Sequence, residues 1–103
     1  MKPISLDEEI EFLDDHPRTK MLHDSAQFRA VLFCLEKDQG VPRHATSSEV
    51  MMQVYRGSGT VIVGDGEFSV NEGDMLVSRP NEAHGFRSDG ERLVILALII
   101  PSP

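Results

Sequence analysis

The chain has 103 residues, 40% hydrophobic and 26% charged, a composition typical of one globular domain with a modest core. Seventeen Asp and Glu against ten Lys and Arg give a formal net charge of −7, which disfavours nucleic acid and anionic membranes as partners. One cysteine excludes an internal disulfide, and we find no apolar leader and no membrane-length apolar run, so we expect a cytoplasmic protein.

The first residues predict a short helix. Ser5 followed by Glu8 is a capping-box pattern, and apolar residues recur after it at helical spacing. We expect an amphipathic helix over residues 6–14, with its carboxylates gathered toward the positive N-terminal end. Pro17 lies shortly after it and favours an end to the helix.

Beyond this helix the sequence changes to short β-rich runs separated by turn signals. FRAVLFCL (28–35) is the first clear strand, and a loop beginning VPRHATSS leads to a second strand, EVMMQVYRG (49–57). TVIVGDGEFSV (60–70) predicts a hairpin joined through Gly64-Asp65-Gly66, in which Asp65-Gly66 suits a tight primed turn. EGDMLVSRP (72–80) predicts a further strand that the proline stops.

The end of the chain predicts the last strands. HGFR (84–87) resumes the β pattern, Asp89-Gly90 predicts a turn, and RLVILALII (92–100) closes the chain. From Val94 to the end of that run every residue is apolar, so neither face of the strand can lie in water. One face would line the interior, and the N-terminal helix or a second subunit would cover the other. We therefore expect a homodimer.

Many short antiparallel strands indicate a sandwich or barrel, and two segments resemble the motifs of the cupin family. GDMLVSRPNEAHGF places Gly73 and His84 eleven positions apart, as the second cupin motif requires. Its proline is one place late at Pro80, Asn81 replaces its second glycine, and Ser88 stands where the motif has asparagine. GVPRHATSSEVMMQVYRGSG is the counterpart of the first motif.

The resemblance covers close to half the chain and implies the fold. We expect an all-β, antiparallel double-stranded β-helix, or jelly-roll barrel, with a short N-terminal helix. Residues 19–103 would form this single barrel domain, and residues 1–18 would form a helical extension in front of it.

In cupins that bind a metal, two histidines and a glutamate of the first motif meet the histidine of the second. Two alignments are open here. In the first, His44 is the leading histidine, while Thr46 and Val50 replace the second histidine and the glutamate. In the second, His44 is the trailing histidine and Glu49 is the glutamate, which requires an extra residue in the strand. We favour the first, because it turns the apolar set Val50, Met52 and Val54 inward.

The first alignment leaves only His44 and His84 as ligands, a reduced or vestigial metal centre. One divalent transition metal (Zn, Ni, Mn or Fe) would then be weakly bound or absent. The second alignment adds Glu49 and restores the two-histidine, one-carboxylate set of non-haem iron sites. His23 is a further candidate ligand, although a surface or core role fits it better. The expected pocket walls are Thr46, Val50, Met52 and Phe86.

These residues leave several functions open. The first is a non-catalytic or weakly catalytic barrel that binds a small molecule. The second is a metal-dependent dioxygenase or isomerase that uses His44, Glu49 and His84. The third is a purely structural domain whose own side chains fill the barrel. The sequence does not decide whether the protein is an enzyme, and it names no catalytic residue and no ligand.

Overall fold

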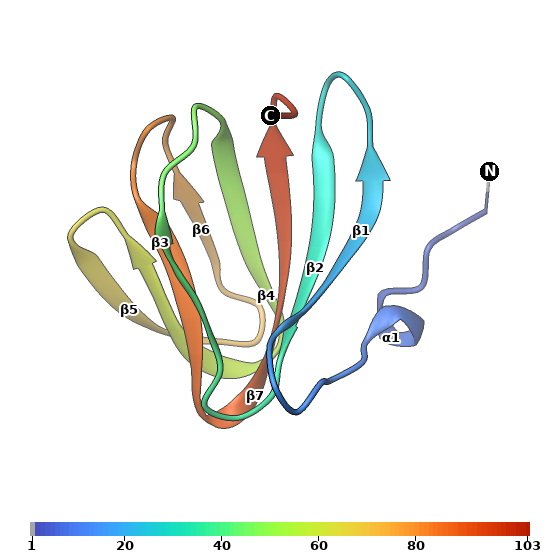
Figure 1. Cartoon of the computed structure of the whole chain (residues 1–103), viewed down its shortest axis with the longest axis vertical. Helices are drawn as coiled ribbons and strands as arrows, with labels where there is room; N and C mark the ends of the chain where they lie inside the picture. Colours follow the sequence, from blue (N-terminus) through green and yellow to red (C-terminus); the bar gives the residue numbers. More distant parts are fainter. Residues whose placement is uncertain (1) are drawn as a thin grey trace.

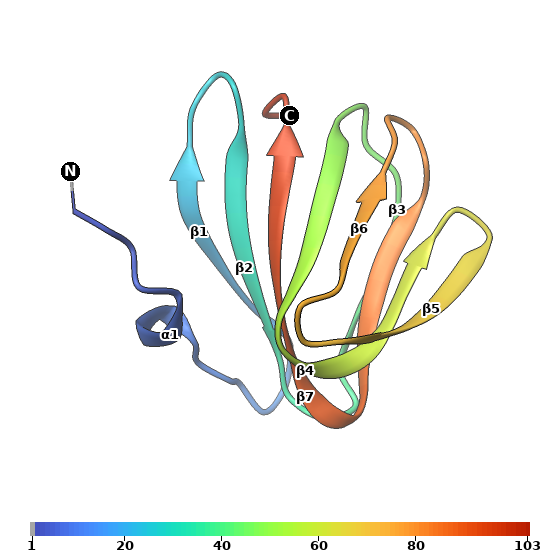
Figure 2. The ribbon, with the colours of Figure 1, turned by 180° about the vertical axis from the view of Figure 1, so that it is seen from behind.

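The computed structural model describes residues 2–103. Within them it has one short helix and seven strands, all paired antiparallel: α1 (Leu6–Glu9), β1 (Arg18–Asp24), β2 (Arg29–Leu35), β3 (Gly40–His44), β4 (Glu49–Val63), β5 (Gly66–Asn71), β6 (Met75–Ser78) and β7 (His84–Ile100). The strands curve around a common interior, and the N-terminal segment runs outside them, next to β1 (Figures 1 and 2). The predicted all-β, antiparallel class is confirmed. No helix of the described part is long and apolar enough to cross a membrane.

Two long strands, β4 and β7, organise the fold. They pair with each other along most of their length, and both bend midway, so that each contributes to two layers. The first half of β4 and the second half of β7 lie in one layer with β1, β2 and β6. The other halves form the second layer with β3 and β5. This arrangement encloses one interior with strands on both sides.

The bend requires a glycine at position 57. The register between β4 and β7 shifts on both sides of it, between Val54 and Arg56 and between Gly57 and Gly59. Gly57 has a φ of +82°, and a Cβ there would overlap the carbonyl oxygen of Arg92 on β7. Only glycine therefore lets the two backbones approach this closely.

Buried apolar residues form two clusters, one inside the barrel and one outside it. The interior cluster comes from both layers: Leu35, Val50, Met52, Val54, Val61, Val70, Phe86, Leu93, Ile95 and Ala97. The outer cluster is Leu32, Cys34 and Val94 on β2 and β7, and Ile10 and Phe12 of the N-terminal segment pack on it. The extended residues after the helix thus cover part of the second face of β7, where the helix itself or a second subunit was expected.

Three local predictions need correction. The helix ends at Glu9 instead of residue 14, because Ile10 is extended and docks with Phe12 on the outer cluster. No turn separates two strands at Asp89-Gly90, because β7 continues through them and absorbs the extra residues in its bend. The expected loop after residue 40 begins with β3, which pairs with β7.

The hairpin of β4 and β5 is confirmed, but its turn lies one residue earlier than the predicted Asp65-Gly66. Val63 pairs with Gly66, so the two turn residues are Gly64 and Asp65. Gly64 has a φ of +59°, as the first central residue of a type II′ turn requires. The two predicted strands 49–57 and 60–63 are one continuous bent strand, β4.

Candidate functional site

Two histidines far apart in the sequence lie side by side in the barrel. His44 ends β3 and His84 begins β7, and the two residues are direct partners in the antiparallel pair. Direct partners project from the same face of a sheet, so both rings point the same way. Their ring centroids are 4.5 Å apart, with an angle of 60° between the ring planes.

Hydrogen bonds fix which nitrogen of each ring is free. Nδ1 of His44 lies 3.0 Å from the carbonyl oxygen of Pro42, and Nδ1 of His84 lies 3.3 Å from that of Glu82. A carbonyl only accepts, so these contacts assign the proton of each neutral ring to Nδ1. The Nε2 atom of each ring then carries a lone pair, and neither makes a hydrogen bond within residues 2–103.

The two rings differ in their surroundings. His84 is only 5% exposed, whereas His44 is exposed. Burial lowers the pKa of His84 below its usual 6.5, and the nearby His44 lowers it further, against opposing contributions from Glu82. His84 is therefore a neutral imidazole at pH 7 that offers an acceptor, not a positive charge.

Ser78 joins the histidines to the wall of the interior. Its hydroxyl is fully buried at the end of β6, 3.2 Å from Nδ1 of His84 and 3.0 Å from the carbonyl oxygen of Glu82. Sequence reasoning missed Ser78. Its spacing could have indicated it: residues two apart on a strand share a face, and Leu76 packs on the interior cluster, so Ser78 also faces inward.

Apolar residues of β4 and β7 form the wall beside this polar pair. Val50 is the direct partner of Ser78, and Val50, Met52 and Phe86 are all at most 3% exposed. Phe86 lies two residues after His84 and meets Phe33 edge to face, with ring centroids 5.0 Å apart. The alternating burial along β4 confirms that Val50, Met52 and Val54 face inward, the basis on which the first alignment was favoured.

Three of the candidate residues, Glu49, Thr46 and His23, make no hydrogen bond or ring contact with His44 or His84 in the described residues. Glu49 is exposed and precedes the inward-facing Val50, so its side chain leaves the opposite face of β4. The hydroxyl of Thr46 accepts a hydrogen bond from the N–H of Ser48 at 3.2 Å and stays within its own turn. His23 stacks on Phe28, with ring centroids 4.5 Å apart.

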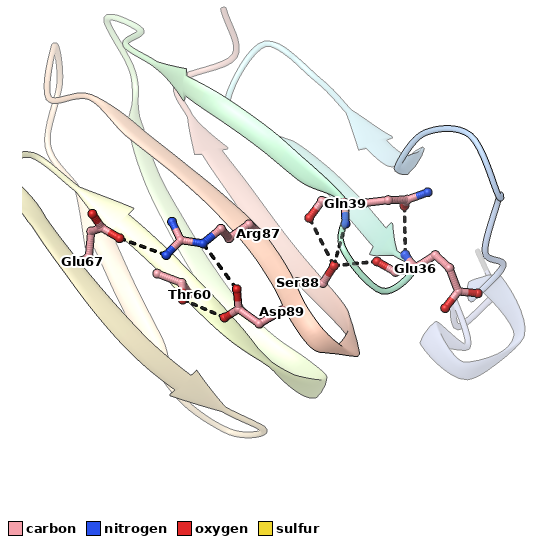
Figure 3. Close-up of polar contacts among 7 residues, drawn as sticks. All are labelled: Glu36, Gln39, Thr60, Glu67, Arg87, Ser88 and Asp89. Carbon is pink, nitrogen blue, oxygen red and sulfur yellow. Dashed lines mark hydrogen bonds and ion pairs between the residues drawn. The ribbon is translucent and has the colours of Figure 1, made fainter.

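Ser88, at the position of the motif asparagine, ties strands together. Its buried hydroxyl donates to the carbonyl oxygen of Glu36 at 2.5 Å and accepts from the N–H of Gln39 at 3.0 Å (Figure 3). These contacts fasten the turn between β2 and β3 to β7. They hold β3, and with it His44, against the strand that carries His84.

A comparison with protein-family models decides the family. Residues 29–101 match the model of the AraC-like ligand-binding domain, which spans more than half of the chain. The chain belongs to the AraC-like ligand-binding family of cupins.

Solved structures show the same fold over the full length of this cupin. An RmlC-like cupin protein from Desulfovibrio desulfuricans is 27% identical, with a TM-score of 0.90 over 100% of this chain and 99% of that one. TT1209 from Thermus thermophilus is 19% identical, with a TM-score of 0.95 over 100% of both chains. A Klebsiella pneumoniae protein described as uncharacterized, with a double-stranded β-helix domain, is 18% identical, with a TM-score of 0.89 over 98% of this chain and 90% of that one. No curated protein sequence matches this cupin.

The donor set of this cupin does not fit the four-ligand metal centre of the family. Within residues 2–103 no three His, Cys, Asp or Glu side chains gather closely enough to hold an ion. His44 and His84 supply two neutral nitrogens and no negative charge. A divalent ion held by these two alone would need water or a ligand for its other positions.

Proposed function

We propose that this cupin binds a small molecule at the His44–His84 pair and is non-catalytic or weakly catalytic. Its metal centre keeps only two of the four ligands that the family has, so that a divalent ion is weakly bound or absent. The observation that carries the proposal is the two ring centroids 4.5 Å apart, with both Nδ1 atoms occupied and both Nε2 atoms free.

The chemistry of the pair indicates the kind of ligand. Imidazole rings whose Nε2 atoms carry a lone pair accept hydrogen bonds, and the neutral ring of His84 attracts no anion by charge. The adjoining wall of Val50, Met52 and Phe86 favours contact with carbon atoms. A ligand with neighbouring hydroxyl or amine donors on an otherwise apolar frame satisfies both requirements. The match to a family of ligand-binding domains supports a small-molecule ligand in general terms.

Metal analysis of protein purified without an affinity tag tests whether this incomplete centre holds an ion. We expect less than one bound ion per chain, and no large loss of thermal stability when a chelator is added. The matched variants are His44→Ala and His84→Ala, with His23→Ala as control because His23 stacks on Phe28 instead. A stoichiometric ion that both site variants lose and the control keeps would replace the proposal by a metal-dependent dioxygenase or isomerase.

Ligand binding is tested by thermal-shift screening of small polyols, amines and their methylated analogues. We expect a stabilising ligand whose effect disappears in His84→Ala and persists in His23→Ala. A ligand that stabilises all three proteins equally would bind elsewhere and remove the pair from the proposal.

We also propose that the chain forms a homodimer through the outer face of the β6–β4–β7 layer. Met75, Val77 and Ile100 are 60%, 44% and 44% exposed, beyond the part that the N-terminal segment covers. Exposed apolar residues gathered on one sheet favour association. Light scattering after gel filtration at low concentration tests the dimer. A mass near 11.5 kDa would rule it out, and Val77→Lys is expected to produce that mass from the dimer.

A further inference from the structure

A cavity lies outside the barrel, at the bend of β4 and β7. Its volume is about 630 Å³, within the range of small-molecule sites. The lining combines the N-terminal segment, the turn after β2 and the bend: Ile10, Phe12, Glu36, Lys37, Arg56, Gly57, Glu91, Arg92 and Val94. None of these residues belongs to the histidine site.

The cavity has an apolar floor. Ile10, Phe12 and Val94 belong to the outer hydrophobic cluster and also line the cavity. The N-terminal segment is held over the bend by Asp7, whose carboxylate accepts from the hydroxyl of Tyr55 at 2.7 Å and from Arg56 at 3.0 Å. The floor therefore exists only where this segment is docked.

Two guanidinium groups line the cavity, and each stacks on an aromatic ring. The Arg92 guanidinium carbon lies 4.4 Å from the centre of the Phe12 ring, and that of Arg56 lies 4.1 Å from the Tyr55 ring. Stacking of this kind holds a guanidinium in place while its edge still donates hydrogen bonds. Both side chains remain about half exposed, so a ligand can reach them.

One nitrogen of the Arg92 guanidinium takes no part in its ion pair. Its Nε and Nη2 donate to the two carboxylate oxygens of Glu36 at 2.9 and 3.0 Å. Nη1 makes no hydrogen bond in the part of the chain that the structure describes. The Glu36 carboxylate already accepts hydrogen bonds from the Arg92 guanidinium and the N–H of Lys37, and both hold its pKa below the usual value. The group of this ion pair that still lacks a hydrogen-bond partner among the described residues is therefore Nη1 of Arg92.

We propose that this cavity binds a small amphipathic anion, an aromatic carboxylate, with the ring on Ile10, Phe12 and Val94 and the carboxylate on Arg92 and Arg56. Three cations, Lys37, Arg56 and Arg92, line it against two carboxylates, Glu36 and Glu91. Arg56 is also paired with Asp7 at 3.0 Å and with Glu72 at 3.6 Å, so the cations at the cavity do not outnumber the carboxylates around it. The ligand carboxylate is therefore held by directed hydrogen bonds, chiefly from Nη1 of Arg92, beside the apolar floor.

The test is a titration with 2-naphthoate, with 2-naphthylmethanol as the neutral probe of the same ring. The chain has no tryptophan, so naphthalene emission reports binding without interference. We expect saturable one-to-one binding of the naphthoate and much weaker binding of the alcohol. Arg92→Gln and Arg56→Gln each raise the dissociation constant roughly tenfold, the usual effect of losing one charge-assisted hydrogen bond. Glu36→Gln releases Arg92 from its partner and lowers the constant.

Two controls locate the probe. Arg87 is as exposed as Arg56 and equally ion-paired, to Glu67 at 3.1 Å and Asp89 at 3.3 Å, but it lies away from the cavity (Figure 3). Arg87→Gln therefore leaves the constant unchanged, and so does His84→Ala. Absence of saturation, equal binding of the alcohol, an equal effect of Arg87→Gln, or loss of binding only in His84→Ala would each overturn the proposal. The last result would place the probe in the barrel and leave the histidine proposal standing.

Discussion

The two faces of the bent β4–β7 pair offer opposite chemistry. The interior face is lined by buried apolar side chains, and the buried side-chain polar atoms of the described residues all have hydrogen-bond partners, while the two histidines at its edge keep free Nε2 atoms. The outer face near the bend carries ion pairs between exposed side chains and the docked N-terminal segment. Burial makes the inner site neutral, whereas exposure lets the outer site keep its charges. One pair of strands thus carries the two proposed binding sites, which differ in chemistry.

Both faces depend on the bend, so a substitution at Gly57 has the largest expected effect. Gly57→Ala adds a Cβ that overlaps the Arg92 carbonyl oxygen at a positive φ, and we expect a loss of about 3–5 kcal/mol in the free energy of unfolding. Gly73→Ala is the matched control. Gly73 also has a positive φ, +95°, but nothing within 4 Å of the added atom. Urea unfolding of the two variants separates the clash from the backbone strain, and equal losses would contradict the role of the bend.

The next prediction contrasts adjacent methionines on the two faces of β4. Met52 is 1% exposed in the interior cluster, and Met52→Ala is expected to cost about 2–5 kcal/mol in the free energy of unfolding. Met51 lies on the outer face and is only half-buried, so Met51→Ala costs less than about 1 kcal/mol. The reverse order in urea unfolding would mean that the strand presents its other face to the core.

This alternation along β4 could be read from the sequence, because a strand repeats every two residues and Val50, Met52 and Val54 are the more apolar set. The approach of His44 to His84 was implied by the resemblance to the two cupin motifs, whose histidines meet inside the barrel. The first inference needed only the pattern of one strand, whereas the second took the packing of the strands from the family.

Other features depend on tertiary contacts that no local pattern contains. The helix stops at Glu9 because Ile10 and Phe12 dock on β2 and β7. These strands are distant in the sequence, so the residues around the helix do not reveal the contact. Asp89-Gly90 is a good turn sequence, but pairing with β4 on both sides makes it part of a bend. The inward direction of Ser78 can be read from its spacing to Leu76, but its contact with His84 depends on the pairing of β6 with β4.

The pH dependence of stability tests the neutral character of the inner face. The pKa of His84 is lowered in the folded protein, mainly by burial, so the folded state resists protonation more than the unfolded chain does. The stability that this provides is present above the unfolded value of about 6.5 and is lost as the pH falls through the lower folded value. We expect the urea midpoint to fall more steeply below about pH 6.5 in the wild type than in His84→Gln. Parallel curves for the two proteins would mean that His84 is not desolvated.

The smallest expected effect concerns the charges that hold the N-terminal segment on the outer face. Asp7→Asn weakens two solvent-exposed hydrogen bonds, to Tyr55 and to Arg56, so the free energy of unfolding should fall only slightly, and less at high salt. A second measurement is more sensitive. The hydrogen bond to Asp7 is the largest cause of the raised pKa of Tyr55, the only tyrosine of the chain. Asp7→Asn should therefore shift the phenolate absorbance titration toward lower pH. Asp14→Asn serves as control, because Asp14 is exposed and makes no ion pair in the described chain. An unchanged Tyr55 titration in Asp7→Asn would mean that the segment is not docked on β4 in solution, and the cavity at the bend would then lack its floor.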